Sequence, residues 1–562
     1  MRQPRRRGWG RAWRASAALL AAACSGELTG LPGRDGGGDG PEPDADPCPP
    51  IADRPGVCQA RGLYDGPIEV ELRPPDGAEI LYTLDGSIPD ATTGQLYDGP
   101  ISIAPPEDRG VVVLRARAGD GPVVTHSYVF PERVLDQAAA PAGFPDTWGN
   151  GQTRAADYAM DARVLGDRAA AAAGLAALPT VSLTLAPDDL FGVERGIYMN
   201  PSLEGVEWER PAVLEMVGDG LSLEVPCGVR VQGGSSTLNW KSPKLSLRVL
   251  FKGEYGAPEL RAPIFGGDGA TASFDTLVLD AHLNYTWIHP EVAQRQRADY
   301  LRDRFASDLA LALGSLAPRG RFVHLYLNGL YWGLYELHER PDEHFAAAYL
   351  GGAAAGYDVL KHTGATVVNG DDQAWRAMFD LARAGLADEA RYAEIQTYLE
   401  VDDFINYMLV NLWAGNDDWP HHNWYATRQR TPEGRFRFHS WDAEHVLTNV
   451  AIDRTGVESP DTPGELFQAL RQNADFRARL AARAGELLAP GGALAPPRPA
   501  ELYRARADEI RPAVLLESAR WGDSQSPEAP HGLAEWDAEQ AWLLDQYFPA
   551  RSDIVAGQLP PP

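Results

Sequence analysis

The stretch NDDWPHHNWY, residues 416–425, is followed by SWD, residues 440–442. Asp418 and Asn423 are five positions apart, and Asp442 comes directly after a strand-like apolar run. In phosphoryl transfer, a carboxylate that activates a hydroxyl and two oxygen ligands for Mg²⁺ must converge on one phosphate. The spacing fits such a site. Because Asp and Asn are common loop residues, the rest of the sequence must show whether it is one.

A glycine- and serine-rich segment lies earlier in the chain. RVQGGSS, residues 230–236, leads into the strand-like SPKLSLRV, residues 242–249, with Lys244 near its start. Backbone N–H groups of the loop could approach a phosphate, and the Lys244 ammonium could add charge. A tight turn followed by a solvated lysine explains the same letters equally well. The loop residues in question are Gly233, Gly234, Ser235 and Ser236.

A predicted β-hairpin lies between these two segments. In LYLNGLYWGLYELHERPD, residues 325–342, Asn328-Gly329 between apolar runs is typical of a type I′ turn, and the hairpin itself is interpreted as structural. Glu339 could orient Lys244 through an ion pair; an exposed acid near a helix start is the alternative. Lys361 ends a short strand-like run and is interpreted as a surface lysine, with a position facing a nucleotide as the alternative.

Together, GGSS…SPKLSLRVLF, HLYLNGLYWGLYELHERPDEHF and NDDWPHHNWYATR…FRFHSWDAEH resemble the spore-coat kinase (CotH) family of atypical protein kinases, over about residues 180–450. The resemblance implies a divergent kinase-like fold that phosphorylates Ser or Thr of proteins with ATP and Mg²⁺. It implies Asp418 as the catalytic residue and Asn423 and Asp442 as metal ligands. It also implies cofactor-binding roles for Lys244, Glu339 and residues 233–236. Asp417 stays open as an alternative to Asp418, and Glu444 and His445 as supports for the metal.

The N-terminus predicts export. Residues 1–23 combine an arginine-rich start with a short apolar run and read as a signal peptide. LAAAC, residues 20–24, resembles a bacterial lipobox, so we expect a lipid anchor at Cys24 and a place at the cell envelope. Cys48 and Cys58 would then form a disulfide, and Cys227 would be a buried thiol. The net charge of −27 argues against nucleic-acid partners.

The predicted organisation is multidomain α+β. Residues 24–61 form a flexible acidic Gly/Pro tether, and 62–130 a small immunoglobulin-like β-sandwich. YTLDGSIP, residues 82–89, resembles the chitobiase/hexosaminidase C-terminal-type module. A spacer role is favoured for it, with carbohydrate contact as the alternative. A connector (131–180), the kinase-like domain (181–460) and its mainly helical C-terminal extension (461–562) complete the chain.

Three functional hypotheses follow. The first is a Mg²⁺-dependent kinase acting on Ser or Thr of secreted or surface proteins. The second is a non-catalytic surface or adhesion protein on a kinase-like scaffold. The third, least favoured, is a metal-dependent hydrolase built on His421, His422, Asp442 and His445, because these residues make no clear ligand framework.

Overall fold

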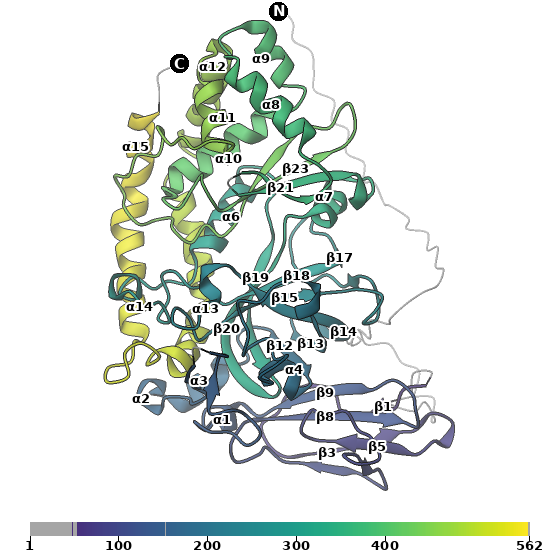
Figure 1. Cartoon of the computed structure of the whole chain (residues 1–562). Coiled ribbons are helices and arrows are strands. Elements are labelled where there is room, and N and C mark those ends of the chain that lie inside the picture. Colours follow the sequence, from purple (N-terminus) through teal and green to yellow (C-terminus); the bar gives the residue numbers. More distant parts are fainter. Residues whose placement is uncertain (1–47, 49–52, 152, 363, 560–562) are drawn as a thin grey trace, which may run out of the picture.

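The protein consists of a β-sandwich, a closed β-barrel and a helical lobe with its own sheet (Figure 1). The computed structural model describes residue 48 and residues 53–151, 153–362 and 364–559. In Figure 1 the sandwich lies at the bottom, the barrel in the middle and the helical lobe at the top. This mixed α/β multidomain architecture agrees with the prediction. The predicted signal peptide, Cys24 and most of the predicted tether lie outside the described residues.

The sandwich consists of short strands that pack their apolar side chains against one another. The main sheet has the order β2-β9-β8-β5-β6, and the pairs β3-β7 and β1-β4 complete the unit. All its strand pairs are antiparallel except β2–β9. Cys48 and Cys58 are joined by a disulfide. The strands are β1 (Gly56–Val57), β2 (Gly62–Leu63), β3 (Ile68–Val70), β4 (Leu72–Arg73), β5 (Ile80–Thr83), β6 (Gln95–Leu96), β7 (Ile101–Ile103), β8 (Val111–Ala118) and β9 (Val124–Val129).

Seven strands close into a barrel in the order β12-β13-β14-β15-β18-β20-β19. Its interior is filled by alternate strand residues, among them Leu247 and Val249, and by the buried thiol Cys227. The predicted hairpin is present: Asn328 and Gly329 have φ values of 46° and 79°, as a type I′ turn requires. The barrel strands are β12 (Thr180–Leu185), β13 (Arg210–Gly218), β14 (Leu221–Gln232), β15 (Ser246–Leu250), β18 (Thr276–Asp280), β19 (Gly320–Leu327) and β20 (Leu330–Glu339).

Short elements connect and cover these units. The predicted connector packs on the barrel, since Trp148 and Tyr158 belong to the barrel core. The short elements are α1 (Pro131–Val134), β10 (Thr147–Trp148), β11 (Arg154–Ala155), α2 (Ala162–Leu165), α3 (Arg168–Gly174), α4 (Pro187–Phe191), β16 (Leu260–Arg261), β17 (Ser273–Phe274), α5 (Val292–Arg295) and α7 (Glu343–Leu350).

The helical lobe is built around a four-stranded sheet of order β22-β21-β23-β24. Leu301, Phe305, Leu309 and Leu313 recur every four residues, a spacing typical of a helix face, and the structure has α6 (Arg302–Ala312) there, with all four side chains buried in the core of this lobe. The sheet strands are β21 (Tyr357–Lys361), β22 (Thr366–Asn369), β23 (Trp424–Gln429) and β24 (Arg437–Ser440); the helices are α8 (Gln373–Arg383), α9 (Glu389–Ile395), α10 (Val401–Ala414), α11 (Pro463–Leu470), α12 (Ala474–Leu488), α14 (Leu533–Trp542) and α15 (Phe548–Gln558).

Helix α13 (Arg498–Trp521) ties the lobes together. Tyr503 and Ile510 lie in the core of the helical lobe, Leu516 packs beside the sandwich contact, and Trp521 enters the barrel core. One helix therefore contributes to three hydrophobic clusters. Within the described residues, no helix is both long and apolar enough to cross a membrane.

The sandwich docks on the barrel through buried charges. Arg61 lies 3.2 Å from Glu215 on β13 and 3.1 Å from Glu224 on β14. Ser127 on β9 donates from its hydroxyl to Glu215 at 2.5 Å. Because these ion pairs and this hydrogen bond are buried, they hold the sandwich in a fixed position against the barrel.

Candidate active site

Three strands of the helical lobe meet at one edge of their sheet. β23 runs antiparallel to β21 and to β24, with Lys361 opposite Tyr425 and Trp424 opposite Ser440. The start of β23 therefore lies between the ends of its two neighbours. Asn423, just before β23, and Asp442, just after β24, share this edge, as the sequence hypothesis required. Both have left-handed backbones, with φ of 64° and 53°, a conformation that Asn and Asp adopt more readily than other residues with a side chain.

The two adjacent acids Asp417 and Asp418 have separate partners. The Nδ2 group of Asn423 donates to the Asp418 side chain at 3.2 Å and to its backbone carbonyl at 3.3 Å. Asp417 instead contacts His445 at 3.3 Å and accepts a hydrogen bond from the Thr448 hydroxyl at 3.2 Å. The structure thus joins Asp418 to Asn423 and ties Asp417 to the following loop.

Carboxylates crowd around Asp442. Solvent reaches Asp442, yet dense protein around it, and then the charges of Glu444, Asp280, Asp303 and Asp418, raise its pKa well above the usual value. Each of these acids disfavours a negative charge on its neighbour. A cation bound here would relieve that repulsion.

The acids around Asp442 are held in place by the barrel and by α6. The backbone N–H of Ala443 donates to Asp303 on α6 at 2.7 Å. Glu444 accepts hydrogen bonds from the backbone N–H of Leu283 at 2.9 Å and from the side chain of Asn284 at 2.6 Å. The segment after β24 is therefore fastened to the loop that follows β18.

A buried histidine bridges Glu444 and a further buried acid, Glu336 of β20. His282 lies 3.2 Å from Glu336 and 3.5 Å from Glu444. Burial opposes a charge on His282, but Asp280, Glu336 and Glu444 outweigh it and raise the histidine pKa well above its usual value. His282 thus supplies a positive charge behind the acidic edge.

The chemistry of the donor set suits Mg²⁺. Asn423 and Asp442 offer an amide oxygen and a carboxylate, which are the hard oxygen ligands that Mg²⁺ prefers. Mg²⁺ keeps several waters and takes further ligands from substrate phosphates, so two protein ligands are enough. In the part of the chain that the structure describes, no group of three or more His, Cys, Asp or Glu side chains could by itself hold a metal ion.

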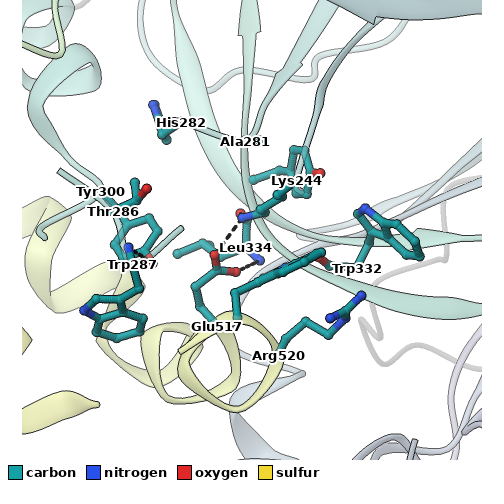
Figure 2. Close-up of polar contacts among 12 residues, drawn as sticks. Lys244, Ala281, His282, Thr286, Trp287, Tyr300, Trp332, Leu334, Glu517 and Arg520 are labelled. Carbon is teal, nitrogen blue, oxygen red and sulfur yellow. Dashed lines mark hydrogen bonds and ion pairs between the residues drawn. The ribbon is translucent and has the colours of Figure 1, made fainter. Parts of the chain in front are cut away.

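Lys244 pairs with a residue that the sequence hypothesis did not include. Its Nζ atom lies 2.7 Å from Glu517 of α13 and donates to the backbone carbonyl of Leu334 at 2.6 Å (Figure 2). Glu517 also accepts from the Leu334 N–H at 2.8 Å. Both charged side chains have no exposed surface. Lys244 could reach a phosphate only if this pair opened, so its cofactor-binding role stays a prediction.

The prediction that Glu339 forms an ion pair with Lys244 is wrong. Glu339 accepts hydrogen bonds from the Arg319 N–H and from the Tyr349 hydroxyl, each at 2.8 Å, and burial raises its pKa to about 7. Lys244 has a different partner because α13 folds back onto the barrel and brings Glu517, 273 residues further along the chain, next to it. No local pattern near Lys244 points to that partner.

The glycine- and serine-rich loop leaves β14 at Gly233. Gly233 has φ of 138°, and a Cβ there would lie 2.4 Å from the Ser236 hydroxyl, so the turn requires glycine. Gly234 and Ser235 are exposed, and Lys241 donates to the Ser235 hydroxyl at 2.8 Å. The loop is open to a ligand, and its phosphate contact stays a prediction.

The histidines of the hydrolase hypothesis do not gather around Asp442. His421 lies 3.3 Å from Asp418, and His445 lies 3.3 Å from Asp417. His422 packs beside His421, with ring centroids 4.5 Å apart. The arrangement distributes the histidines between two different acids and gives the hydrolase hypothesis no support.

Family comparisons identify the chain as a kinase-like protein with an accessory module. The model of the CotH kinase protein matches residues 229–554, more than half of the chain. The chain therefore belongs to the CotH kinase family. The model of the chitobiase/beta-hexosaminidase C-terminal domain matches residues 59–124, which is the β-sandwich. No curated protein matches the chain.

Proposed function

We propose that the protein is a Mg²⁺-dependent kinase that transfers the γ-phosphate of ATP to Ser or Thr of exported or surface proteins. The observation that carries this proposal is the contact of Asp418 with Asn423 at the sheet edge shared with Asp442. Membership of the CotH kinase family supports it. The crowded acids around Asp442 supply the negative charge that a divalent cation requires.

In this proposal each residue has a defined task. Asp418 accepts a hydrogen bond from the acceptor hydroxyl and takes its proton as the new phosphoester bond forms and the bond from the γ-phosphorus to the β–γ bridging oxygen breaks, which releases ADP. Asn423 and Asp442 would hold Mg²⁺, which would neutralise charge on the phosphates. Asn423 also fixes Asp418 through its Nδ2 group. The loop at residues 233–236 would contact the nucleotide.

Three substitutions test the assignment, with Asp417→Asn as the matched control for Asp418→Asn. Purified protein with Mg²⁺ and γ-labelled ATP is compared with Asp418→Asn, Asp417→Asn and Asp442→Asn, using casein and the protein itself as acceptors. Loss of label in Asp418→Asn and Asp442→Asn, with Asp417→Asn close to the parent, supports the kinase. A parent protein that transfers no label and binds no ATP with Mg²⁺ would sink it.

One observation favours a second candidate, a non-catalytic surface protein. The lysine of the SPKLSLRV segment, Lys244, is enclosed with Glu517 and holds the barrel to α13. A scaffold would have this use for a buried ion pair without any nucleotide. Transfer of label by the parent protein in the experiment above would exclude this candidate.

We also propose that the protein acts at the cell envelope. The predicted lipid anchor at Cys24 would hold it to the membrane, and its substrates would be exported proteins bearing Ser or Thr. The docked sandwich would serve as a fixed spacer, with carbohydrate contact as the alternative. Metabolic labelling with a palmitate analogue, lost in Cys24→Ala, tests the anchor.

A further inference from the structure

Two arginines lie opposite each other on the outside of the barrel. Arg230 on β14 and Arg248 on β15 are direct cross-strand partners. Leu247 and Val249, the neighbours of Arg248, lie in the barrel core, so Arg248 points outward. Like charges at directly opposed strand positions are destabilising. A bound anion would relieve the repulsion between these two guanidinium groups.

Two more cations lie nearby, Lys361 from the helical lobe and Arg340 from the position just after barrel strand β20. Lys361 ends β21, and its Nζ atom lies 5.9 Å from the centre of the Tyr425 ring. The guanidinium of Arg340 lies 5.5 Å from the same ring. Burial, followed by the charges of Arg340 and Arg248, lowers the pKa of Lys361 to about 8. The four cations Arg230, Arg248, Arg340 and Lys361, here called the cation cluster, are thus close enough to repel one another.

The protein neutralises only half of the cation cluster directly. Arg230 lies 3.4 Å from Glu209, and Arg340 lies 3.1 Å from Asp342. Arg248 donates to the neutral side-chain oxygen of Gln232, and in the described residues no carboxylate lies within ion-pair distance of Arg248 or Lys361. In that part of the chain two partly buried cations therefore remain without a close ion pair, and the more distant carboxylates of Glu204 and Asp342 favour the charges of Lys361 and Arg248 respectively.

The cation cluster adjoins the acidic edge of the active site. Lys361 pairs with Tyr425 on β23, two residues after Asn423. Ser246, on the same face of β15 as Arg248, donates to Asp280 at 2.8 Å, and Asp280 is one of the acids that act on Asp442. Cations and metal-binding acids thus stand side by side, as binding of a metal–polyphosphate ligand requires.

We propose that the cation cluster is the subsite for the phosphate chain of a nucleoside triphosphate, with Arg248 and Lys361 as its principal contacts. Arginine binds phosphate oxygens in a bidentate manner, and lysine adds a compact charge. The assignment gives the phosphate contact predicted for Lys244 to residues that are accessible. It rests on the proposed kinase function for the nucleotide, but the phosphate chemistry can be tested separately.

The test compares phosphate ligands by titration calorimetry. Inorganic triphosphate, ATP, adenosine and a phosphoserine peptide are titrated into the parent protein, Arg248→Met, Lys361→Met and the control Arg261→Met. The Arg261 side chain is 80% exposed on β16, outside the cation cluster. Losing one charge-assisted contact should weaken binding of triphosphate and ATP about 10- to 100-fold. Arg261→Met should leave both unchanged, and circular dichroism melting checks the fold of each variant.

Each outcome of these titrations decides whether the cation cluster binds the phosphate chain. Weaker binding of triphosphate and ATP in both cluster variants supports the subsite, even if the parent transfers no phosphate; in that case only the kinase proposal fails. ATP binding that is unchanged in both variants overturns the subsite and leaves the kinase proposal standing. A parent that binds no triphosphate, or that binds the phosphoserine peptide more tightly than triphosphate through these residues, also overturns it.

Discussion

Lys244 and Lys361 show two opposite uses of a lysine at a strand end. Lys244 is enclosed, and its charge is neutralised by Glu517 of α13. Lys361 is partly exposed, and its nearest charged neighbours include other cations. A neutralised buried lysine holds the fold together, whereas a lysine left among like charges lowers stability until an anion binds. Local sequence favoured the first as the ligand contact, and the geometry favours the second.

The largest effect should come from breaking the enclosed pair. Glu517→Gln keeps the shape of the side chain but leaves the Lys244 charge buried without an anion. We expect a loss of about 3–5 kcal/mol in the free energy of unfolding, measured from urea transitions followed by tryptophan fluorescence. If the loss were as small as in the surface control Glu486→Gln, Lys244 would not be the neutralised member of the comparison.

Replacing both members of the Lys244–Glu517 pair tests whether the buried charge causes this loss of stability. Lys244→Met combined with Glu517→Leu removes both charges at once, so no uncompensated charge stays buried. We expect the double variant to be more stable than Glu517→Gln, since apolar replacement of a whole buried pair is often close to neutral. Equal or greater destabilisation would show that the hydrogen bonds to Leu334, and not the charges, dominate this site.

A second enclosed charge should respond to pH. Burial raises the pKa of Glu215 to about 7, against the opposing effects of Arg61 and Ser127. The folded protein therefore keeps a proton that the unfolded chain loses near pH 4.5, so this contribution is full below pH 4.5 and is lost as pH rises to 7. The free energy of unfolding of Glu215→Gln should therefore rise relative to that of the parent by roughly 3 kcal/mol across this pH window.

Thermal melting of parent and variant from pH 4 to 8 measures that gain as a growing difference in midpoint. Other buried acids titrate in both proteins and cancel in the difference. A difference that stays constant with pH would mean that Glu215 is ionised throughout and belongs with the fully neutralised charges.

The smallest effect concerns the cation cluster without a ligand. Arg248→Met removes one of two opposed arginines, so we expect stability to rise by about 0.2–1 kcal/mol. At the same concentration, added inorganic triphosphate should raise the melting temperature of the parent more than that of the variant. A variant less stable than the ligand-free parent would place Arg248 with Lys244, among the residues that hold the fold together.

The local patterns of the sequence predicted much of the architecture. Asn328-Gly329 formed the expected turn, the apolar spacing from Leu301 to Leu313 formed α6, and the YTLDGSIP segment lies in the sandwich. These features depend on neighbours in the chain, so single-sequence reasoning reaches them. The shared edge of Asn423 and Asp442 was also accessible, because a short strand pair separates them.

The partners of charged residues were not accessible in this way. Glu517 meets Lys244 only because α13 returns to the barrel, and Arg248 faces Lys361 only because two lobes meet. In the sequence each is an ordinary charged residue. The repulsion within the cation cluster is a property of the assembled fold, and no spacing rule within one segment predicts it.

The position of Glu517 also sets an order in time. During synthesis the barrel strands emerge long before α13, so the Lys244 charge has no partner until nearly the whole chain has been made. Until then, closing the barrel around that charge is unfavourable. The last long helix therefore completes the charge balance of the barrel: a chain that ended before residue 517 would leave the Lys244 charge without its anionic partner.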